Sequence, residues 1–124
     1  MESTPEEQVR QHLIAQLLKL GYPPSLIAVE KALSELPHLQ GQTLPNRRLD
    51  CLCYANAETP LLLIECKAEA LTPDAERQLI GYNGYVGAPY LALVNGSEAR
   101  FGQRREGEWH FISGLVPYAR LLRQ

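Results

Sequence analysis

The sequence predicts a single α/β domain in which a central mixed β-sheet is flanked by helices. Its 124 residues are enough for one hydrophobic core and too few for two. Apolar residues make up 45% of the chain and charged residues 21%, which is ordinary usage for a globular protein. Helical and strand-like apolar patterns alternate along the chain. We therefore expect one domain that spans residues 1–124.

Three helices are expected. Apolar residues recur at helical spacing over residues 5–20, and Ser3 or Thr4, followed by two glutamates, provides a helix start. Thr72 is a good N-cap for a second helix over residues 73–86, because the proline that follows it needs no hydrogen-bond partner at the first helical position. The third helix is a short one that closes the chain at 117–122.

Six segments are expected to form strands: 26–33, 47–54, 61–67, 88–94, 98–103 and 109–112. Glu30 would lie inside the first strand, and residues 35–45 show no clear period, so they are interpreted as a loop or a ragged strand. The connection at 55–60 suits a hairpin. The nearly unbroken apolar run at 88–94 indicates a strand buried on both faces. With the preceding helix it forms a crossover onto a parallel neighbour.

The predicted hairpin separates polar from apolar side chains. A turn centred between Ala57 and Glu58 places Asp50 opposite Glu65, because side chains on paired strands alternate between the two faces. It also places Arg48 opposite Lys67, so these four polar side chains share one face. The opposite face is apolar and is expected to be the core side: Leu49, Cys51, Cys53, Leu62, Ile64 and Cys66. The cysteines are thus interpreted as buried free thiols.

Two carboxylates directly opposite on neighbouring strands repel each other unless a cation or a proton lies between them. Asp50 and Glu65 therefore predict a cation site. An all-oxygen site with few protein ligands suits Mg²⁺ or Mn²⁺ better than zinc. Lys67, two residues beyond Glu65 on the same face, could orient or deprotonate an attacking water or stabilise charge on a phosphoryl group. These residue types fit hydrolysis of a phosphodiester.

A simpler interpretation of the same residues is a surface lattice of cross-strand ion pairs, each of which contributes little to stability. The apolar run Leu61–Ile64 argues against it, because a strand of that composition is expected to be internal.

In this order and spacing the residues resemble the PD-(D/E)xK nuclease superfamily. More narrowly, they resemble the N-terminal nuclease domain of type I restriction enzyme R subunits, which also occurs as a small free-standing protein. The resemblance covers nearly the whole chain and is carried by five stretches and two single residues: Pro5–Gln11, Val29–Glu30, Arg47–Asp50, Leu63–Lys67 and Val94–Gly96, with Gln78 and Tyr82. Leu49 departs from the proline of the superfamily motif. The implied fold is restriction-endonuclease-like.

The resemblance also implies roles for single residues. Asp50 and Glu65 would hold the metal, Cys66 would contribute its backbone carbonyl as a ligand, and Lys67 would be the catalytic lysine. Glu30 would bind metal through water or fix Lys67, although a surface glutamate explains it nearly as well.

Some residues are candidates for contact with nucleic acid. Gln78 and Tyr82, four residues apart on one helix face, could reach DNA or the site, and ordinary helix polarity is the alternative. Arg47 and Arg48 are further candidates for this contact. The net charge of −2 argues against an extended basic surface, but it does not exclude a local patch.

The resulting hypothesis is a Mg²⁺- or Mn²⁺-dependent nuclease that acts on DNA. The main alternative is a non-catalytic module that keeps the nuclease fold and binds nucleic acid or a protein partner, including a restriction-system partner. A homodimer is a third possibility, since a small domain often needs a second copy to act on both strands. The chain is expected to be cytoplasmic, because it carries no signal-peptide pattern and no apolar run long enough to cross a membrane.

Overall fold

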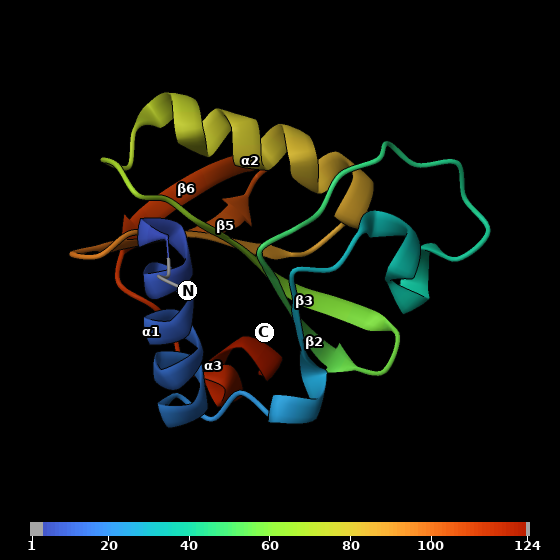
Figure 1. Ribbon diagram of the computed structural model, residues 1–124, viewed down its shortest axis with the longest axis horizontal. Helices are drawn as coiled ribbons and strands as arrows, with labels where there is room; N and C mark the ends of the chain where they lie inside the picture. Colours follow the sequence, from blue (N-terminus) through green and yellow to red (C-terminus); the bar gives the residue numbers. More distant parts are fainter. Residues whose placement is uncertain (1–3, 124) are drawn as a thin grey trace.

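The computed structural model describes residues 4–123 and contains one six-stranded mixed sheet with strand order β1-β2-β3-β4-β5-β6 (Figure 1). The strands are β1 (Ile27–Val29), β2 (Cys51–Asn56), β3 (Thr59–Cys66), β4 (Tyr90–Val94), β5 (Ala99–Arg105) and β6 (Glu108–Ser113). Neighbouring strands are antiparallel except for β3 and β4, which are parallel. The predicted α/β class and the predicted parallel crossover are therefore confirmed.

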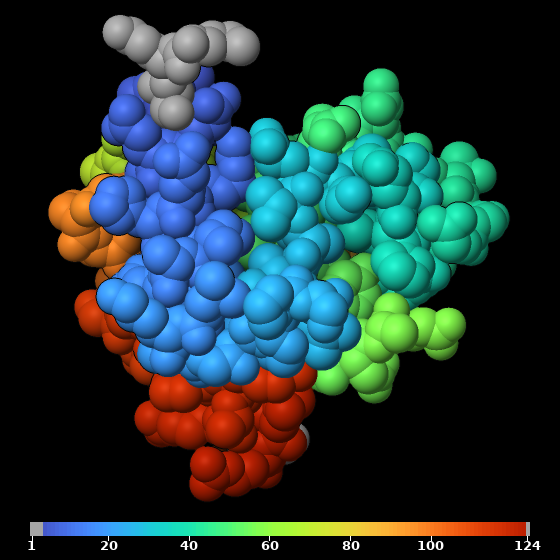
Figure 2. All heavy atoms as spheres, turned by 60° about the horizontal axis from the view of Figure 1, so that its bottom comes forward, coloured from blue at the N-terminus to red at the C-terminus, as the bar shows by residue number. Residues whose placement is uncertain are grey.

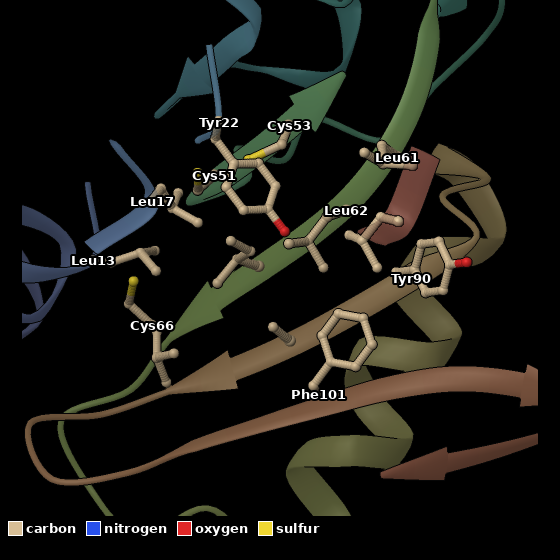
Figure 3. Packing of buried hydrophobic residues seen from close by; sticks show 14 of the residues in the cluster. Leu13, Leu17, Tyr22, Cys51, Cys53, Leu61, Leu62, Cys66, Tyr90 and Phe101 are labelled. Carbon is tan, nitrogen blue, oxygen red and sulfur yellow. The ribbon is translucent and has the colours of Figure 1, made fainter. Parts of the chain in front are cut away.

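Helices cover both faces of the sheet. In Figure 1, α1 (Pro5–Lys19) and α3 (Tyr118–Leu122) lie on one side of it and α2 (Pro73–Val86) on the other. The first face forms a cluster with Leu13, Leu17 and the three cysteines, part of which is drawn in Figure 3. The second face packs against α2 and two 3₁₀ helices, η2 (Leu33–Glu35) and η3 (Pro37–Leu39). The sheet is thus an internal layer between two cores.

Burial of both faces corrects the expectation that only one face of the hairpin belongs to the core. Leu52 and Leu63, which point to the polar side of the predicted hairpin, are 0% and 2% exposed. Leu49 also packs in the cluster on the α2 side rather than with the cysteines. It precedes the first residue of β2, so strict alternation along the strand does not extend to it.

The hairpin has the predicted register and a shorter turn than expected. Cys51 pairs with Ile64 and Cys53 with Leu62, as a turn centred at 57–58 requires. The strands continue to Asn56 and Thr59, so the turn consists of two residues instead of the six at 55–60. The Asn56 side chain accepts hydrogen bonds from the backbone N–H groups of Glu58 and Thr59, and this fixes the tight turn.

The segment after α1 differs most from expectation. The strand predicted over 26–33 is limited to β1, because Glu30 has a φ of +52° and leaves the extended conformation. The following residues form η2 and η3 and bury three leucines at intervals of three: Leu33, Leu36 and Leu39. That interval is the period of a 3₁₀ helix, so each leucine faces the core.

The helix ends agree with the predicted caps. The Thr4 hydroxyl accepts from the N–H of Glu7, and the Thr72 hydroxyl accepts from the N–H of Ala75. Ser3, the other candidate for the first cap, lies outside the described residues. Gly87 ends α2 with a φ of +78°, a conformation that glycine adopts without strain. None of the helices in residues 4–123 is long and apolar enough to cross a lipid bilayer.

The two ends of the described chain pack together. Figure 2 shows α1 in blue, the residues that follow it in light blue and the C-terminal segment in red as one continuous surface. The Tyr22 hydroxyl donates to the Val116 carbonyl at 2.7 Å, and the Tyr118 N–H donates to the Leu20 carbonyl at 3.0 Å. These contacts hold α1 against the sheet, which matters because α1 contributes a charged side chain to the site described below.

Two glycines allow a matched test of the packing. A Cβ at Gly102 would lie 2.6 Å from a ring carbon of Phe111 on the neighbouring strand, whereas a Cβ at Gly84 on α2 would meet nothing within 4 Å. We expect Gly102→Ala to lower the free energy of unfolding by about 1–2 kcal/mol through overpacking. Gly84→Ala should raise it by about 0.5–1 kcal/mol through helix propensity. Urea titration followed by circular dichroism measures both, and equal effects would contradict this packing.

Candidate functional site

The candidate site lies where β2 begins and β3 ends. Asp50 directly precedes β2, Glu65 is the penultimate residue of β3, and Lys67 follows its last residue. The observed register, continued by one residue from the Cys51–Ile64 pair, brings Asp50 level with Glu65. Both carboxylates line one small cavity beneath α2. The predicted juxtaposition of these two acidic residues is therefore present.

Asp50 is fixed by contacts at both of its carboxylate oxygens. Its Oδ2 accepts a hydrogen bond of 2.9 Å from the backbone N–H of Cys66. Its Oδ1 lies 3.7 Å from Nη1 of Arg10, and the side chain is 23% exposed. The bond to Cys66 ties the residue before β2 to the end of β3, so the carboxylate is held beside Glu65.

Glu65 and Lys67 form the second part of the site. Lys67 Nζ lies 3.9 Å from Glu65 Oε1. The backbone N–H of Lys67 donates to the Val94 carbonyl at 2.8 Å, which extends the pairing of β3 and β4 beyond the strand end and fixes the lysine backbone. Burial raises the pKa of Glu65; Lys67 opposes this shift and Asp50 adds to it. A partly buried carboxyl beside a second carboxylate binds a proton or a cation more readily than a fully exposed one.

Glu30 occupies a different position from the one predicted, because it follows β1 instead of lying within a strand. Two contacts hold its left-handed backbone. The Glu30 N–H donates to the Asp50 carbonyl at 3.0 Å, and the Arg48 guanidinium donates to the Glu30 carbonyl. The ion pair that the structure shows for Glu30 is with Arg10 at 3.1 Å, whereas the one for Lys67 is with Glu65. Glu30 thus reaches the site through Arg10.

Arg10 is the site residue that the sequence analysis did not assign. It projects from α1 with a side chain only 12% exposed and contacts both Glu30 and Asp50. The available signal was its place on the helix, next to the buried Val9 and one turn before the buried Leu13. A charged residue at the border of an apolar helix face needs a partner on the layer beneath it.

Arg47, Gln78 and Tyr82 come together beside Glu65. With Gly81 and Tyr85 they line a hollow of about 290 Å³. The Arg47 guanidinium lies 4.4 Å from the centre of the Tyr82 ring, a cation–π contact. Gln78 and Tyr82 share one face of α2, as predicted. Among the described residues, the Tyr82 hydroxyl is a buried polar group without a hydrogen-bond partner, and burial raises its pKa.

Arg48 does not line this hollow. It lines the small cavity with Asp50 and Glu65 and contacts the Glu30 carbonyl. Two other arginines make contacts away from Asp50 and Glu65. Arg77 pairs with Asp74 on α2, and the Arg104 guanidinium lies 5.7 Å from the centre of the Trp109 ring. A nucleic-acid role for Arg47 and Arg48 stays a prediction.

The donors at the site fit a hard divalent ion better than zinc. The Cys66 thiol is 2% exposed and packs in the core on the α1 side, and it does not line the cavity that Asp50 and Glu65 share. Within residues 4–123, no group of three or more histidine, cysteine, aspartate or glutamate side chains could hold a metal. His38 is engaged by the Tyr54 hydroxyl and the Val86 carbonyl. Two carboxylates, with a backbone carbonyl as the third predicted ligand, leave positions for water, as Mg²⁺ prefers.

Larger hollows lie away from the carboxylate pair. One of about 740 Å³ separates α1 from the loop after β4 and is lined by His12, Gln16, Lys19 and Asn95 among others. Another of about 580 Å³ lies between the end of α2 and the β5–β6 hairpin. Neither brings two carboxylates together beside a lysine, so the site at Asp50 and Glu65 remains the candidate for chemistry.

Residues 5–115 match the family model described as type I restriction enzyme R protein N terminus. The chain belongs to this family. The match includes every residue of the candidate site, so the resemblance inferred from the sequence is confirmed at the level of the family.

A solved structure shows the same fold. The fragment structure of a putative HsdR subunit of a type I restriction enzyme from Vibrio vulnificus YJ016 superposes with a TM-score of 0.68 at 17% sequence identity. The match covers 90% of this chain and 23% of that one, so this chain corresponds to under a quarter of that protein. No curated protein matches the chain.

Proposed function

We propose that this chain is a divalent-metal-dependent nuclease domain that hydrolyses phosphodiester bonds in DNA. The observation that carries the proposal is the arrangement of Asp50 and Glu65 on one cavity with the Lys67 ammonium 3.9 Å from Glu65. Membership of the R protein N-terminal family supports a nuclease-related role. Two carboxylates held level on adjacent strands repel each other unless a cation or a proton lies between them, and a bound divalent ion would supply that charge.

Each residue of the site has a role in this proposed reaction. Asp50, Glu65 and the Cys66 carbonyl would hold Mg²⁺ or Mn²⁺, which when bound supplies a Lewis acid at the phosphate and makes water a better nucleophile. Lys67 stabilises the negative charge that develops on the phosphate and orients the attacking water. The Arg47 guanidinium attracts the phosphate backbone of the DNA. Gln78 and Tyr82 contact the nucleotide that enters the hollow beside Glu65.

The test is cleavage of supercoiled plasmid DNA by the purified chain with Mg²⁺ or Mn²⁺. We expect nicking that EDTA stops, and a loss of at least about 100-fold in rate for Lys67→Ala, as is typical when a group that stabilises transition-state charge is removed. Lys19→Ala, which removes an exposed lysine of α1, is the matched control and should cleave at the wild-type rate. Cleavage that survives Lys67→Ala would contradict the assigned role of Lys67.

A second candidate function is a non-catalytic module that binds nucleic acid, and the ion pairs at the site favour it. Arg10 contacts Asp50 and Lys67 contacts Glu65, so protein cations already compensate part of the carboxylate charge. This module would bind DNA with an affinity that falls steeply with salt and would not cleave it under any metal condition. Absence of nicking together with salt-sensitive binding would select this function over the nuclease.

A further inference from the structure

We infer that Arg10 is a positioning residue that competes with the divalent ion for Asp50, and that Glu30 controls this competition by holding the arginine away. The inference rests on the proposed metal site. Arg10 bridges two carboxylates: its Nη2 lies 3.1 Å from Glu30 Oε1, while its Nη1 lies 3.7 Å from Asp50 Oδ1. Arg10 is therefore bound more closely to Glu30 and contacts Asp50 at longer range.

The geometry of Glu30 fits this holding role. Its backbone adopts a left-handed conformation with φ +52°, which is unfavourable for a residue with a side chain. The Asp50 carbonyl accepts from its N–H, and Arg48 donates to its carbonyl, so the strained conformation is fixed from two directions. The Glu30 side chain is 56% exposed, yet its carboxylate meets the nearly buried guanidinium of Arg10.

Arg10 has few other ways to place its charge. Its side chain is 12% exposed, and it projects from a helix that Val9 and Leu13 anchor in the core. A buried guanidinium needs a carboxylate partner, because it remains charged at every accessible pH. If Glu30 did not bind it, Arg10 would move onto Asp50 and place a positive charge where the metal needs a negative one.

The two partners therefore have opposite effects on metal affinity. Removing Arg10 takes a positive charge away from the metal site and should tighten binding. Removing the charge of Glu30 frees Arg10 to pair with Asp50 and should weaken binding. A merely structural bridge would behave differently, since loss of either partner would then loosen the site and change affinity in the same direction.

The experiment is a titration of metal-free protein with Mn²⁺ in the absence of DNA, followed by calorimetry and by the electron paramagnetic resonance signal of free Mn²⁺. We expect Arg10→Gln to lower the Kd by about ten-fold, as expected when a unit charge near a divalent ion is removed in a partly solvated site. Glu30→Gln should raise the Kd by several-fold. Arg120→Gln, which removes an exposed arginine of α3, is the control and should leave the Kd unchanged.

The double variant Arg10→Gln/Glu30→Gln separates an indirect role of Glu30 from a direct one. If Glu30 acts through Arg10, the double variant binds Mn²⁺ as tightly as Arg10→Gln alone. If it binds more weakly than Arg10→Gln, Glu30 contacts the metal itself and the inference is overturned. Melting of each metal-free variant by circular dichroism verifies that it is folded. Arg10→Met is a second charge-removing replacement should Arg10→Gln not fold; a lower Kd supports competition, and an unchanged or higher Kd overturns it.

Failure of the inference is distinguishable from failure of the proposed function. If the wild-type chain binds Mn²⁺ and Arg10→Gln binds it equally or more weakly, competition by Arg10 is excluded while the metal site stands. If neither the wild type nor Arg10→Gln binds Mn²⁺, both the metal site and the inference are wrong. Binding by Arg10→Gln alone would support the inference strongly, because the arginine would then be the group that keeps the metal out.

Discussion

Replacing Asp50 with asparagine is expected to slow metal-dependent DNA cleavage by about 1000-fold while the fold remains intact. Asparagine keeps a side-chain oxygen that can accept the hydrogen bond now made by the Cys66 N–H at 2.9 Å. It removes the negative charge that the proposed metal site needs at this position. The measurements are the rate of plasmid nicking under saturating Mn²⁺ and the thermal midpoint of the same preparation.

The comparison with Asp50→Ala separates charge from hydrogen bonding. Alanine leaves the Cys66 N–H without its acceptor at the end of β3, which should cost about 1–3 kcal/mol in the free energy of unfolding beyond the effect of Asp50→Asn. Both variants should be equally inactive. Asp74→Asn, at an exposed position in the first turn of α2, is the control and should cleave normally. An active Asp50→Asn enzyme would remove Asp50 from the proposed chemistry.

The part of the site that follows from strand alternation could be predicted from the sequence. A turn at 57–58 fixes the hairpin register, and the register alone places Asp50 beside Glu65 with Lys67 one step further on the same face. The helical period likewise places Gln78 and Tyr82 together on α2, where they line one hollow. These relations are local, so they depend only on the geometry of one hairpin and one helix.

The contacts of Arg10 and Glu30 could not be predicted in this way, because they depend on how α1 is placed over the sheet. Forty residues separate Arg10 from Asp50 in the sequence, and the position of the helix is set by packing of Leu13, Leu17 and Tyr22 in the core. The left-handed backbone of Glu30 is stabilised by Asp50 and Arg48, neither of which is its neighbour in sequence. Tertiary contacts here override the strand propensity of the branched residues before it.

A similar distinction applies to the fold. The strands around the hairpin and the crossover through α2 were predicted because their apolar patterns are long and regular. The short 3₁₀ helices were not, since a period of three over seven residues is hard to separate from an irregular loop. Leu52 and Leu63 lie on the hairpin face that was not assigned to the core, and the α2 layer buries them.

The largest effect expected on stability comes from Leu91→Ala, which should lower the free energy of unfolding by roughly 3 kcal/mol. Leu91 lies in β4 near the middle of the sheet and is 0% exposed. It pairs with Leu63 on one side and Gly102 on the other, beneath α2. The measurement is urea unfolding, with a fall of about 10 °C in thermal midpoint as a second readout. Leu18→Ala, at a leucine 46% exposed on α1, should change stability by less than about 0.5 kcal/mol.

The size of this effect depends on whether the neighbours of Leu91 can fill the space it leaves. Gly102 has no side chain to offer, and the Phe111 ring lies over it from the next strand. Residues that pair across strands share a face, so the ring lies on the face of Leu91 and can shift toward an alanine at 91. In that case a double variant with Gly102→Ala should be less destabilised than the sum of the two single changes, because the displaced ring enters the cavity. Strict additivity would mean that the ring is held in place and that the core between β4, β5 and α2 does not relax.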